Sequence, residues 1–295
     1  MSDFLYRKNK KFYLALLLPA LVLYGGALVC PLLFGTLPYS FLNWNLMKGK
    51  RSFTGLTNYI RLFSDEKFIH AVCFTILLAV ISILFSNLLA FAVAFMLDQN
   101  VRAKGVIRSF FFIPNIISGV MVAFVWSFIF TNAIPNIGQL LHIDALSNIS
   151  WFGNPRMSMT AVVIVTAWQS TGFLMMLYVA GLQTIPKDVI EAAMLDGCVG
   201  FSKILKIQLP LLMPTVTINL FVSIAGAFKS FDIPLSLTGG GPANSTQTIA
   251  LNIYTDAFGA YKTGYASAKS MLLFLIVAAI AFFQLRITRK REVQM

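Results

Sequence analysis

The sequence predicts an all-α, polytopic membrane protein with about six transmembrane helices. Of its 295 residues, 58% are hydrophobic and only 12% are charged, and the mean hydropathy is +0.77. A soluble domain carries about 25% charged residues, so much of the apolar surface must face lipid rather than water. The apolar residues are also gathered into runs of roughly 20, the length that an α-helix needs to cross a bilayer.

Six such runs follow one another, and each predicts one membrane span. The first contains Pro19, Pro31 and Pro38, so we expect it to be kinked or to end early. It is too long for the apolar part of a signal peptide, which predicts an uncleaved first span. The predicted spans are Phe12–Tyr39, Phe68–Leu97, Val106–Thr131, Met157–Gln183, Leu211–Ala227 and Ser270–Leu285.

The distribution of Lys and Arg predicts that both termini are cytoplasmic (N-in/C-in). With this topology 14 of the 23 basic residues fall on the cytoplasmic side, where positive charge is enriched. The first outer loop opposes this rule, because it holds Lys48, Lys50, Arg51, Arg61 and Lys67. The predicted organisation is a cytoplasmic N-terminus (1–11), a single transmembrane domain (12–285) with a cytoplasmic loop (184–210), and a cytoplasmic C-terminus (286–295).

The composition disfavours several other function classes. The net charge of +12 does not indicate nucleic-acid binding, because the charges lie between apolar runs and form no basic domain. Cys30, Cys73 and Cys198 are too few and too scattered for a disulfide framework or a zinc site. His70 and His142 have no carboxylate neighbour at catalytic spacing. We therefore expect no catalytic residue, no metal site and no enzymatic activity.

The loop between the fourth and fifth predicted spans has the pattern of a short helix that ends at a glycine. Asp188 suits the positive end of the helix dipole, and Gly197 can end the helix with a positive φ. A face of apolar and small residues follows the helical spacing and consists of Ile190, Ala193, Met194 and Gly197. On these grounds alone, an interfacial amphipathic helix is an equally good interpretation.

This loop resembles the EAA loop of permease subunits in bacterial binding-protein-dependent ABC importers. The pattern Glu-Ala-Ala, three residues, Gly, nine residues, Ile-x-Leu-Pro is matched at every position, by Glu191, Ala192, Ala193, Gly197, Ile207, Leu209 and Pro210. The resemblance implies an ABC importer permease fold in the bacterial cytoplasmic (inner) membrane. It also implies a coupling helix that docks in a cleft of a cytoplasmic ATPase, where the matching Glu pairs with a basic residue. The implied coupling residues are Glu191, Ala192, Ala193, Asp196 and Gly197.

The same resemblance implies the partners. They are a second, homologous permease subunit that forms a heterodimer with this chain, two ATPase subunits, and an extracytoplasmic substrate-binding protein. ATP would be bound by the ATPase subunits, so this chain is expected to hold no cofactor of its own.

The Ile-x-Leu-Pro end of the loop also predicts where the next membrane helix starts. Pro210 is expected to open that helix.

A second stretch resembles the sugar-permease branch of this family, the maltose and glycerol-3-phosphate type. The stretch starts at Phe231-Asp232, contains Thr238-Gly-Gly-Gly-Pro242 and is followed by Tyr265-Ala-Ser-Ala. The maltose permease subunit has extra N-terminal spans and a large external domain, so this chain looks like the smaller six-span form. No Lys-Ser/Thr follows Gly241, and we interpret the glycines as a tight external turn near a docked binding protein, not as a phosphate loop.

The resemblance implies a function in the import of a sugar, an oligosaccharide in the first place. The chain would form half of the translocation path, and the maltose-contacting positions of the family fall at Gln169, Ser170, Phe173, Ser223, Gly226, Ala227 and Ser230. An aromatic face and a few donors and acceptors suit a sugar. Gly226 and Ala227 replace larger residues of the maltose subunit, which predicts a wider pocket. Ordinary interhelical packing by these residues is an open alternative.

Further polar residues in and beside the predicted spans bear on the substrate and on the function class. Asn87, Asn115 and Gln169 lie at membrane depth, where polar groups usually face the bundle interior. Lys229 and Asp232 are expected to pair with each other or to face the outer water, but an anionic sugar derivative or glycerol-3-phosphate stays open as substrate. A secondary ion-coupled carrier would need buried carboxylates in its spans, and most of the 11 acidic residues lie in loops.

Overall fold

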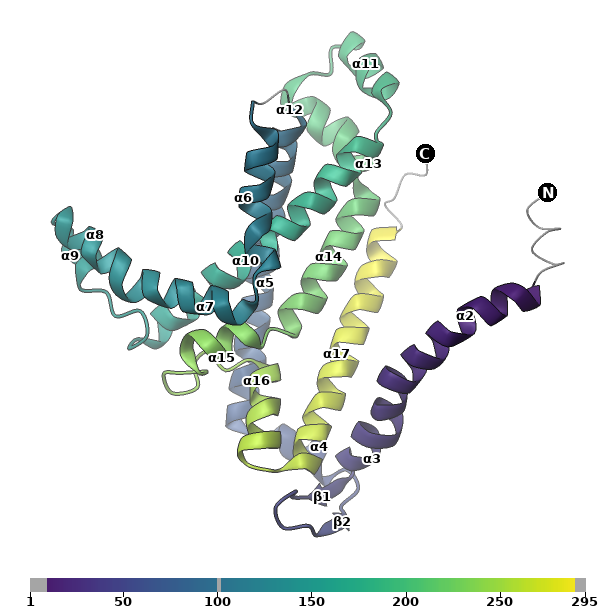
Figure 1. Ribbon diagram of the computed structural model, residues 1–295, viewed down its shortest axis with the longest axis vertical. Coiled ribbons are helices and arrows are strands. Elements are labelled where there is room, and N and C mark those ends of the chain that lie inside the picture. Colours follow the sequence, from purple (N-terminus) through teal and green to yellow (C-terminus); the bar gives the residue numbers. More distant parts are fainter. Residues whose placement is uncertain (1–9, 100–101, 290–295) are drawn as a thin grey trace. The chain divides into compact units, whose positions relative to one another are not determined.

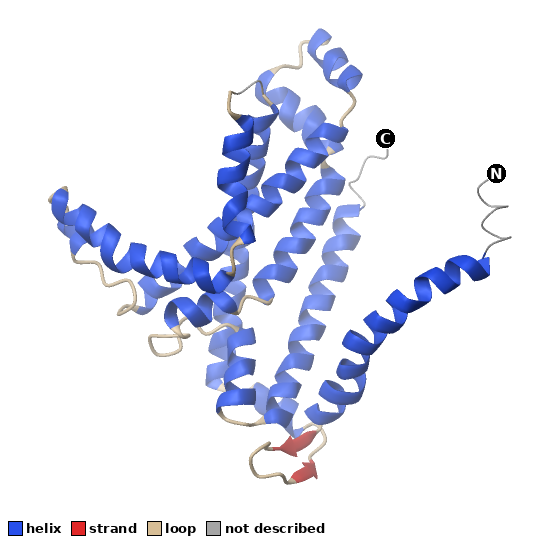
Figure 2. Ribbon diagram, in the orientation of Figure 1, coloured by secondary structure: helices blue, strands red, loops and turns tan. Residues whose placement is uncertain are grey.

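The computed structural model describes residues 10–99 and 102–289, which are almost entirely helical apart from one small hairpin (Figure 2). These residues form two compact units. Unit 1 consists of residues 10–64 and 253–272, and unit 2 consists of residues 65–252 and 273–289. Within the described residues, five helical segments are long and apolar enough to span a membrane, and a sixth is added if one bent pair counts as a span. The all-α membrane fold is therefore confirmed.

Unit 1 begins with the first predicted span. Helix α2 (Lys10–Tyr24) is followed by two π-helical turns, η1 (Gly25–Val29) and η2 (Pro31–Thr36), and by α3 (Leu37–Ser40). The span does not end early at its prolines, because the wider π turns accommodate Pro31 and Pro38 at the start of helical segments. The predicted N-terminal segment lies outside the described residues up to residue 9.

A hairpin and a short helix complete the N-terminal part of unit 1 (Figure 1). Strands β1 (Leu42–Trp44) and β2 (Arg51–Phe53) pair antiparallel, with Asn43 opposite Ser52. Helix α4 (Thr57–Leu62) follows. No strand was expected from the sequence, since three-residue strands have no periodicity that an apolar-run search can detect.

Unit 2 is built around α5 (Glu66–Asp98) and α10 (Pro155–Thr184), which contain the second and fourth predicted spans. Side chains fix where both helices begin. The Asp65 carboxylate accepts hydrogen bonds from the backbone N–H groups of Lys67 and Phe68, and the Asn154 side chain accepts one from Arg156. Leu78 of α5 and Val162 and Val165 of α10 lie in the same buried apolar cluster.

The third predicted span, Val106–Thr131, is wrong as a single helix. Helix α6 (Lys104–Ile116) ends, Ile117 and Ser118 are extended, and α7 (Gly119–Phe128) begins. Pro114 near the end of α6 cannot donate a backbone hydrogen bond, which weakens the last helical turn. The apolar segment of spanning length instead starts at Gly119 and runs through η3 (Ile129–Ala133) to the end of α8 (Ile134–Leu140), and α9 (Asp144–Ser147) follows.

The fifth predicted span agrees with α14 (Met213–Phe228) to within two residues. Before it, α11 (Lys187–Leu195), α12 (Gly200–Lys203), η4 (Ile204–Gln208) and α13 (Leu209–Leu211) form the loop region. The chain bends by 73° between the segment that ends at Leu211 and α14. Pro210 therefore lies before the bend and does not open the membrane helix; Pro214 occupies that place.

The C-terminal part of the chain starts with α15 (Asp232–Thr238), α16 (Ile249–Tyr254) and η5 (Thr255–Gly259). The last helix, α17 (Thr263–Arg289), contains the sixth predicted span and begins seven residues before it. In unit 2, Leu273, Ile276 and Val277 of α17 pack against Ala227 and Phe228 of α14.

Helices α6 and α10 approach each other closely at Gly172, where a side chain would not fit. A Cβ added there would lie 1.9 Å from the carbonyl oxygen of Phe111. A Cβ at Gly226, by contrast, would meet no atom within 4 Å. Both glycines lie inside helices, where alanine is intrinsically better by about 1 kcal/mol.

These two glycines give a matched test of the packing. We expect Gly172→Ala to lower the free energy of unfolding by about 1–3 kcal/mol, because α6 must move away from α10. Gly226→Ala should leave the stability unchanged or raise it. Thermal unfolding of the two purified variants in detergent measures the difference. Equal melting temperatures would contradict the α6–α10 contact.

Candidate functional site

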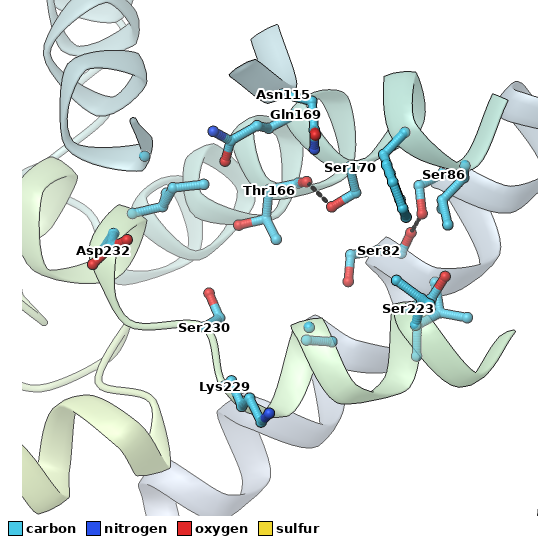
Figure 3. A pocket seen from close by; sticks show the side chains of 18 of the residues that line it. Ser82, Ser86, Asn115, Thr166, Gln169, Ser170, Ser223, Lys229, Ser230 and Asp232 are labelled. Carbon is cyan, nitrogen blue, oxygen red and sulfur yellow. Dashed lines mark hydrogen bonds between the residues drawn. The ribbon is translucent and has the colours of Figure 1, made fainter. Parts of the chain in front are cut away.

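A cavity of about 400 Å³ lies in unit 2 between α5, α10, α14, the break between α6 and α7, and the start of α15. Its volume is within the range of roughly 300–1,000 Å³ that is usual for small-molecule sites. Figure 3 shows polar side chains from all of these elements around it. They are Ser82, Ser86, Asn115, Thr166, Gln169, Ser170, Ser223, Lys229, Ser230 and Asp232.

All seven residues predicted to line the substrate path lie around this one cavity. Three come from consecutive turns of α10, three from α14, and one from the residues just after α14. They are Gln169, Ser170, Phe173, Ser223, Gly226, Ala227 and Ser230. Their contact with a substrate stays a prediction. The fold nevertheless brings together residues that are up to 61 positions apart in the sequence.

Gln169 fills the break between α6 and α7. Its side-chain Nε2 donates hydrogen bonds to the carbonyl oxygens of Pro114 and Ile117, at 3.3 and 3.2 Å. These carbonyls lie where the helix stops, so they lack the helical partners that a continuous α-helix would provide. The amide therefore satisfies the backbone at the point where the cavity wall opens.

Three hydroxyl residues on the cavity wall were not singled out from the sequence. The Oγ atoms of Ser82 and Ser86 donate to the carbonyls of Leu78 and Ser82 within α5, each at 2.5 Å. Thr166 differs, because its Oγ1 is buried and has no hydrogen-bond partner within the described residues. The one sequence signal was the i, i+4 spacing of Ser82 and Ser86, which is common in membrane helices.

Asn87 joins the three long helices next to the cavity. Its Nδ2 donates to Ser223 Oγ at 3.0 Å, and its Oδ1 accepts a hydrogen bond from the Tyr178 hydroxyl at 3.1 Å. The prediction that Asn87 faces the bundle interior is confirmed. Asn115, also expected to face inward, lines the cavity itself.

Lys229 and Asp232 both line the cavity, on either side of Ser230 (Figure 3). Of the two arrangements expected for them, the ion pair is not formed in the part of the chain that the structure describes. Both side chains are exposed. The cavity thus has one cationic and one anionic group at its rim.

The predicted coupling loop forms a short helix, α11, that ends as expected at a glycine. Gly197 has φ +75°, its N–H donates to the carbonyl of Met194, and the N–H of Cys198 donates to the carbonyl of Ala193. This double hydrogen bond is the Schellman motif, which satisfies the last carbonyls of a helix. The helix and its glycine end are therefore confirmed as structure, while docking to an ATPase stays a prediction.

One of the five coupling residues is buried, and four are exposed. Ala193 is buried, and its neighbour Ile190 packs against the core of unit 2. Glu191, Ala192, Asp196 and Gly197 are exposed. Apolar residues are exposed as well, namely Leu195 in the last turn of α11, with 89% of its surface exposed, and Val199 and Phe201 in the segment that follows. Exposed apolar residues beside charged ones suit a partner protein.

The glycine-rich turn after α15 is held firmly within unit 2. Thr238 Oγ1 and Thr246 Oγ1 are hydrogen-bonded at 2.6 Å, and the N–H of Ile249 donates to Thr75 Oγ1. Residues 245–249 are buried. The tight turn is confirmed, and it is anchored to α5. No group of three or more metal-ligating side chains occurs among the described residues.

Comparison with known proteins gives the family context. A family model described as "Binding-protein-dependent transport system inner membrane component" matches residues 86–293. The chain is 35% identical over 288 residues to the probable starch degradation products transport system permease protein AmyD of Thermoanaerobacterium thermosulfurigenes, covering 98% of this chain and 97% of AmyD. It is 32% identical over 255 residues to the multiple sugar-binding transport system permease protein MsmF of Streptococcus mutans, covering 86% and 88%.

A solved structure supports the fold. The chain resembles a subunit of a bacterial ABC transporter involved in the import of the acidic polysaccharide alginate, with a TM-score of 0.81. The sequence identity is 20%, and the match covers 97% of each chain. At this identity the match speaks for the fold alone.

A measurement of protein stability tests whether Gln169 holds the break between α6 and α7, a role distinct from the predicted contact with a substrate. We expect Gln169→Leu to lower the free energy of unfolding by about 1–3 kcal/mol, since two carbonyls lose their donor. Ser170→Ala, next to it, should cost less than that, because the Ser170 hydroxyl bonds only the Thr166 carbonyl of its own helix. Denaturation of both variants in detergent checks the difference. A Gln169→Leu variant as stable as wild type would show that the break is satisfied in another way.

Proposed function

The chain belongs to the family of binding-protein-dependent transport system inner membrane components, and from this premise we propose that it is the permease subunit of a sugar importer. As a family member it is a multi-pass protein of the bacterial cytoplasmic membrane and works in transport with a binding protein. Membership also removes the ion-coupled carrier as an alternative. The observation that carries the sugar assignment is the cavity, where hydroxyl, amide and aromatic groups converge.

The chemistry of the cavity suits a polyhydroxylated ligand. Phe173 offers an aromatic face, with 37% of its surface exposed, and apolar faces of sugar rings stack on such groups. The Thr166 hydroxyl has no partner among the described residues, although buried polar groups are normally hydrogen-bonded. A ligand hydroxyl would satisfy it once the atoms that now bury this oxygen move aside. The names of AmyD and MsmF point to the same substrate class.

The width of the cavity favours an oligosaccharide. A side chain at Gly226 would meet open space, and Ala227 next to it is small. A chain of sugar units needs such a path, whereas a compact ligand would need more side-chain contacts to be held. Lys229 at the rim leaves an anionic sugar as a second candidate, because its amine has no carboxylate partner within the described residues.

Transport would be powered through α11. We infer that the exposed face of α11 docks on one of two cytoplasmic ATPase subunits, which bind ATP, and that a second permease subunit supplies the other half of the path. The apolar residues around Glu191 support this docking. Helix α10 connects the two sites directly, since Gln169 and Thr184 are separated by about 22 Å at 1.5 Å per residue.

Charge reversal on α11 tests the coupling. We expect Glu191→Lys to reduce ATP-driven uptake to less than a tenth, because a cation of the ATPase would be left buried without its partner, at a cost of about 3–5 kcal/mol. Insertion into the membrane should be unaffected, as Glu191 is exposed in the subunit. Uptake and ATP hydrolysis are measured in proteoliposomes that contain the whole transporter.

The matched control for this experiment is Asp144→Lys, the same charge reversal on the exposed surface of α9. It should transport at the wild-type rate. If Glu191→Lys also transported normally, α11 would not be the coupling helix.

Filling the cavity tests the substrate path. Gly226→Leu adds a side chain into open space, so the fold should persist while the path narrows. We expect substrate uptake to fall at least tenfold, which corresponds to a total loss of about 1.4 kcal/mol or more in the interaction with the substrate. ATP hydrolysis should still be stimulated. Phe221→Leu, on the exposed side of α14 and outside the cavity, is the control. Normal uptake by Gly226→Leu would place the path elsewhere.

A further inference from the structure

The basic residues that oppose the charge rule gather in one pocket of unit 1. Four of the five cations of the first outer loop line a pocket of about 600 Å³, and a fifth cation comes from the segment before α17. They are Lys48, Lys50, Arg51, Arg61 and Lys262. The lining is completed by two aromatic and four polar residues, namely Trp44, Tyr265, Asn43, Asn45, Ser52 and Asn58.

Two distant segments build this pocket together. The backbone N–H of Leu46 donates to the carbonyl of Tyr261 at 3.0 Å, so the hairpin is fastened to the residues before α17. The pairing of Trp44 with Arg51 in the hairpin places the arginine on the same face as the tryptophan ring. The pocket brings together cations as far apart in the sequence as Lys48 and Lys262, so it arises from the fold and not from a local run of charges.

Aromatic rings, not carboxylates, hold the two arginines. The guanidinium carbon of Arg51 lies 4.2 Å from the centre of the Trp44 ring, and that of Arg61 lies 5.1 Å from the centre of the Tyr265 ring. Stacking on a ring fixes a guanidinium and leaves its N–H donors available to a ligand. Within the described residues, none of the five cations forms an ion pair; the nearby Asp256 carboxylate is already bound to Lys269.

The segments that form this pocket, the hairpin and α4, also carry exposed apolar side chains. Phe53 and Phe63 have 78% and 77% of their surface exposed. Further exposed apolar residues of the hairpin and of α4 are Leu46, Met47, Leu56 and Ile60. Unpaired cations beside exposed aromatic and aliphatic groups are typical of a surface that meets lipid headgroups and acyl chains together.

We propose that this pocket binds the phosphodiester headgroup of an anionic phospholipid in the outer leaflet. The phosphate accepts hydrogen bonds from the ring-held guanidinium groups of Arg51 and Arg61, and the lysines add charge at the rim. The side chains of Asn43 and Ser52 suit the hydroxyl groups of a headgroup. The acyl chains lie along the exposed apolar residues of the hairpin and α4. The lipid thereby offsets the outer positive charge that the topology rule disfavours.

Lipid retention by the purified full-length chain tests this assignment. Native mass spectrometry compares protein from nanodiscs that contain equal amounts of phosphatidylglycerol and phosphatidylcholine. Wild type should retain phosphatidylglycerol at least fivefold over phosphatidylcholine, and Arg51→Gln/Arg61→Gln should lose this preference. The control Lys67→Gln/Arg156→Gln removes two exposed cations outside the pocket and should keep it.

Three results would overturn the proposal. If wild type and the pocket variant retained phosphatidylglycerol over phosphatidylcholine to the same degree, the pocket would hold no lipid. Displacement of the lipid by millimolar inorganic phosphate would show a site for a free anion. Unchanged lipid retention with weakened attachment of the binding protein would show a protein-docking surface. Thermal unfolding and size-exclusion chromatography of the variants establish that they are folded, and none of these readouts depends on which solute is transported.

Discussion

The structure of unit 2 depends on the rule that a backbone carbonyl among membrane helices must find a donor, since lipid offers none. The chain breaks between α6 and α7, and the Gln169 amide donates to two carbonyls at the end of α6, those of Pro114 and Ile117. This single side chain supplies the donor that these two carbonyls lack where the helix stops. The residues at the break, Asn115 and Gly119 among them, form one wall of the cavity, so the site exists because the break is satisfied.

The same rule divides the polar side chains around the cavity into those with a hydrogen-bond partner and one without a partner among the described residues. Ser82 and Ser86 bond carbonyls of their own helix, and Asn87 ties α5 to α10 and α14. The Thr166 hydroxyl is buried and unpaired within the described chain. Satisfied groups contribute to rigidity, whereas the buried and unpaired Thr166 hydroxyl carries a desolvation cost that the described fold does not offset.

Helix α10 runs between the cavity and α11. Its middle turns present Gln169 and Phe173 to the cavity, and its last turn leads directly into α11 with Glu191. A rigid helix of 30 residues can transmit a shift at one end to the other, and its close contact with α6 at Gly172 would couple the two helices. Binding of ATP by partner subunits and passage of a sugar through the cavity would be linked in this way.

The membrane class, most spans and the short helix α11 with its glycine end followed from local composition, helical spacing and a motif, which the sequence contains directly. The seven positions around the cavity followed from the resemblance to the sugar-permease branch. Three features became visible only in the fold: the division of the third apolar run into two helices, the bend before α14, and the lack of an ion pair between Lys229 and Asp232 among the described residues. Hydropathy is averaged over a whole apolar run, so it does not show a single break in a helix. The break between α6 and α7 is satisfied by the Gln169 side chain, 55 residues away from Pro114 in the sequence. The clustering of Arg51 and Lys262 likewise needed the fold, because charge counts contain no distances.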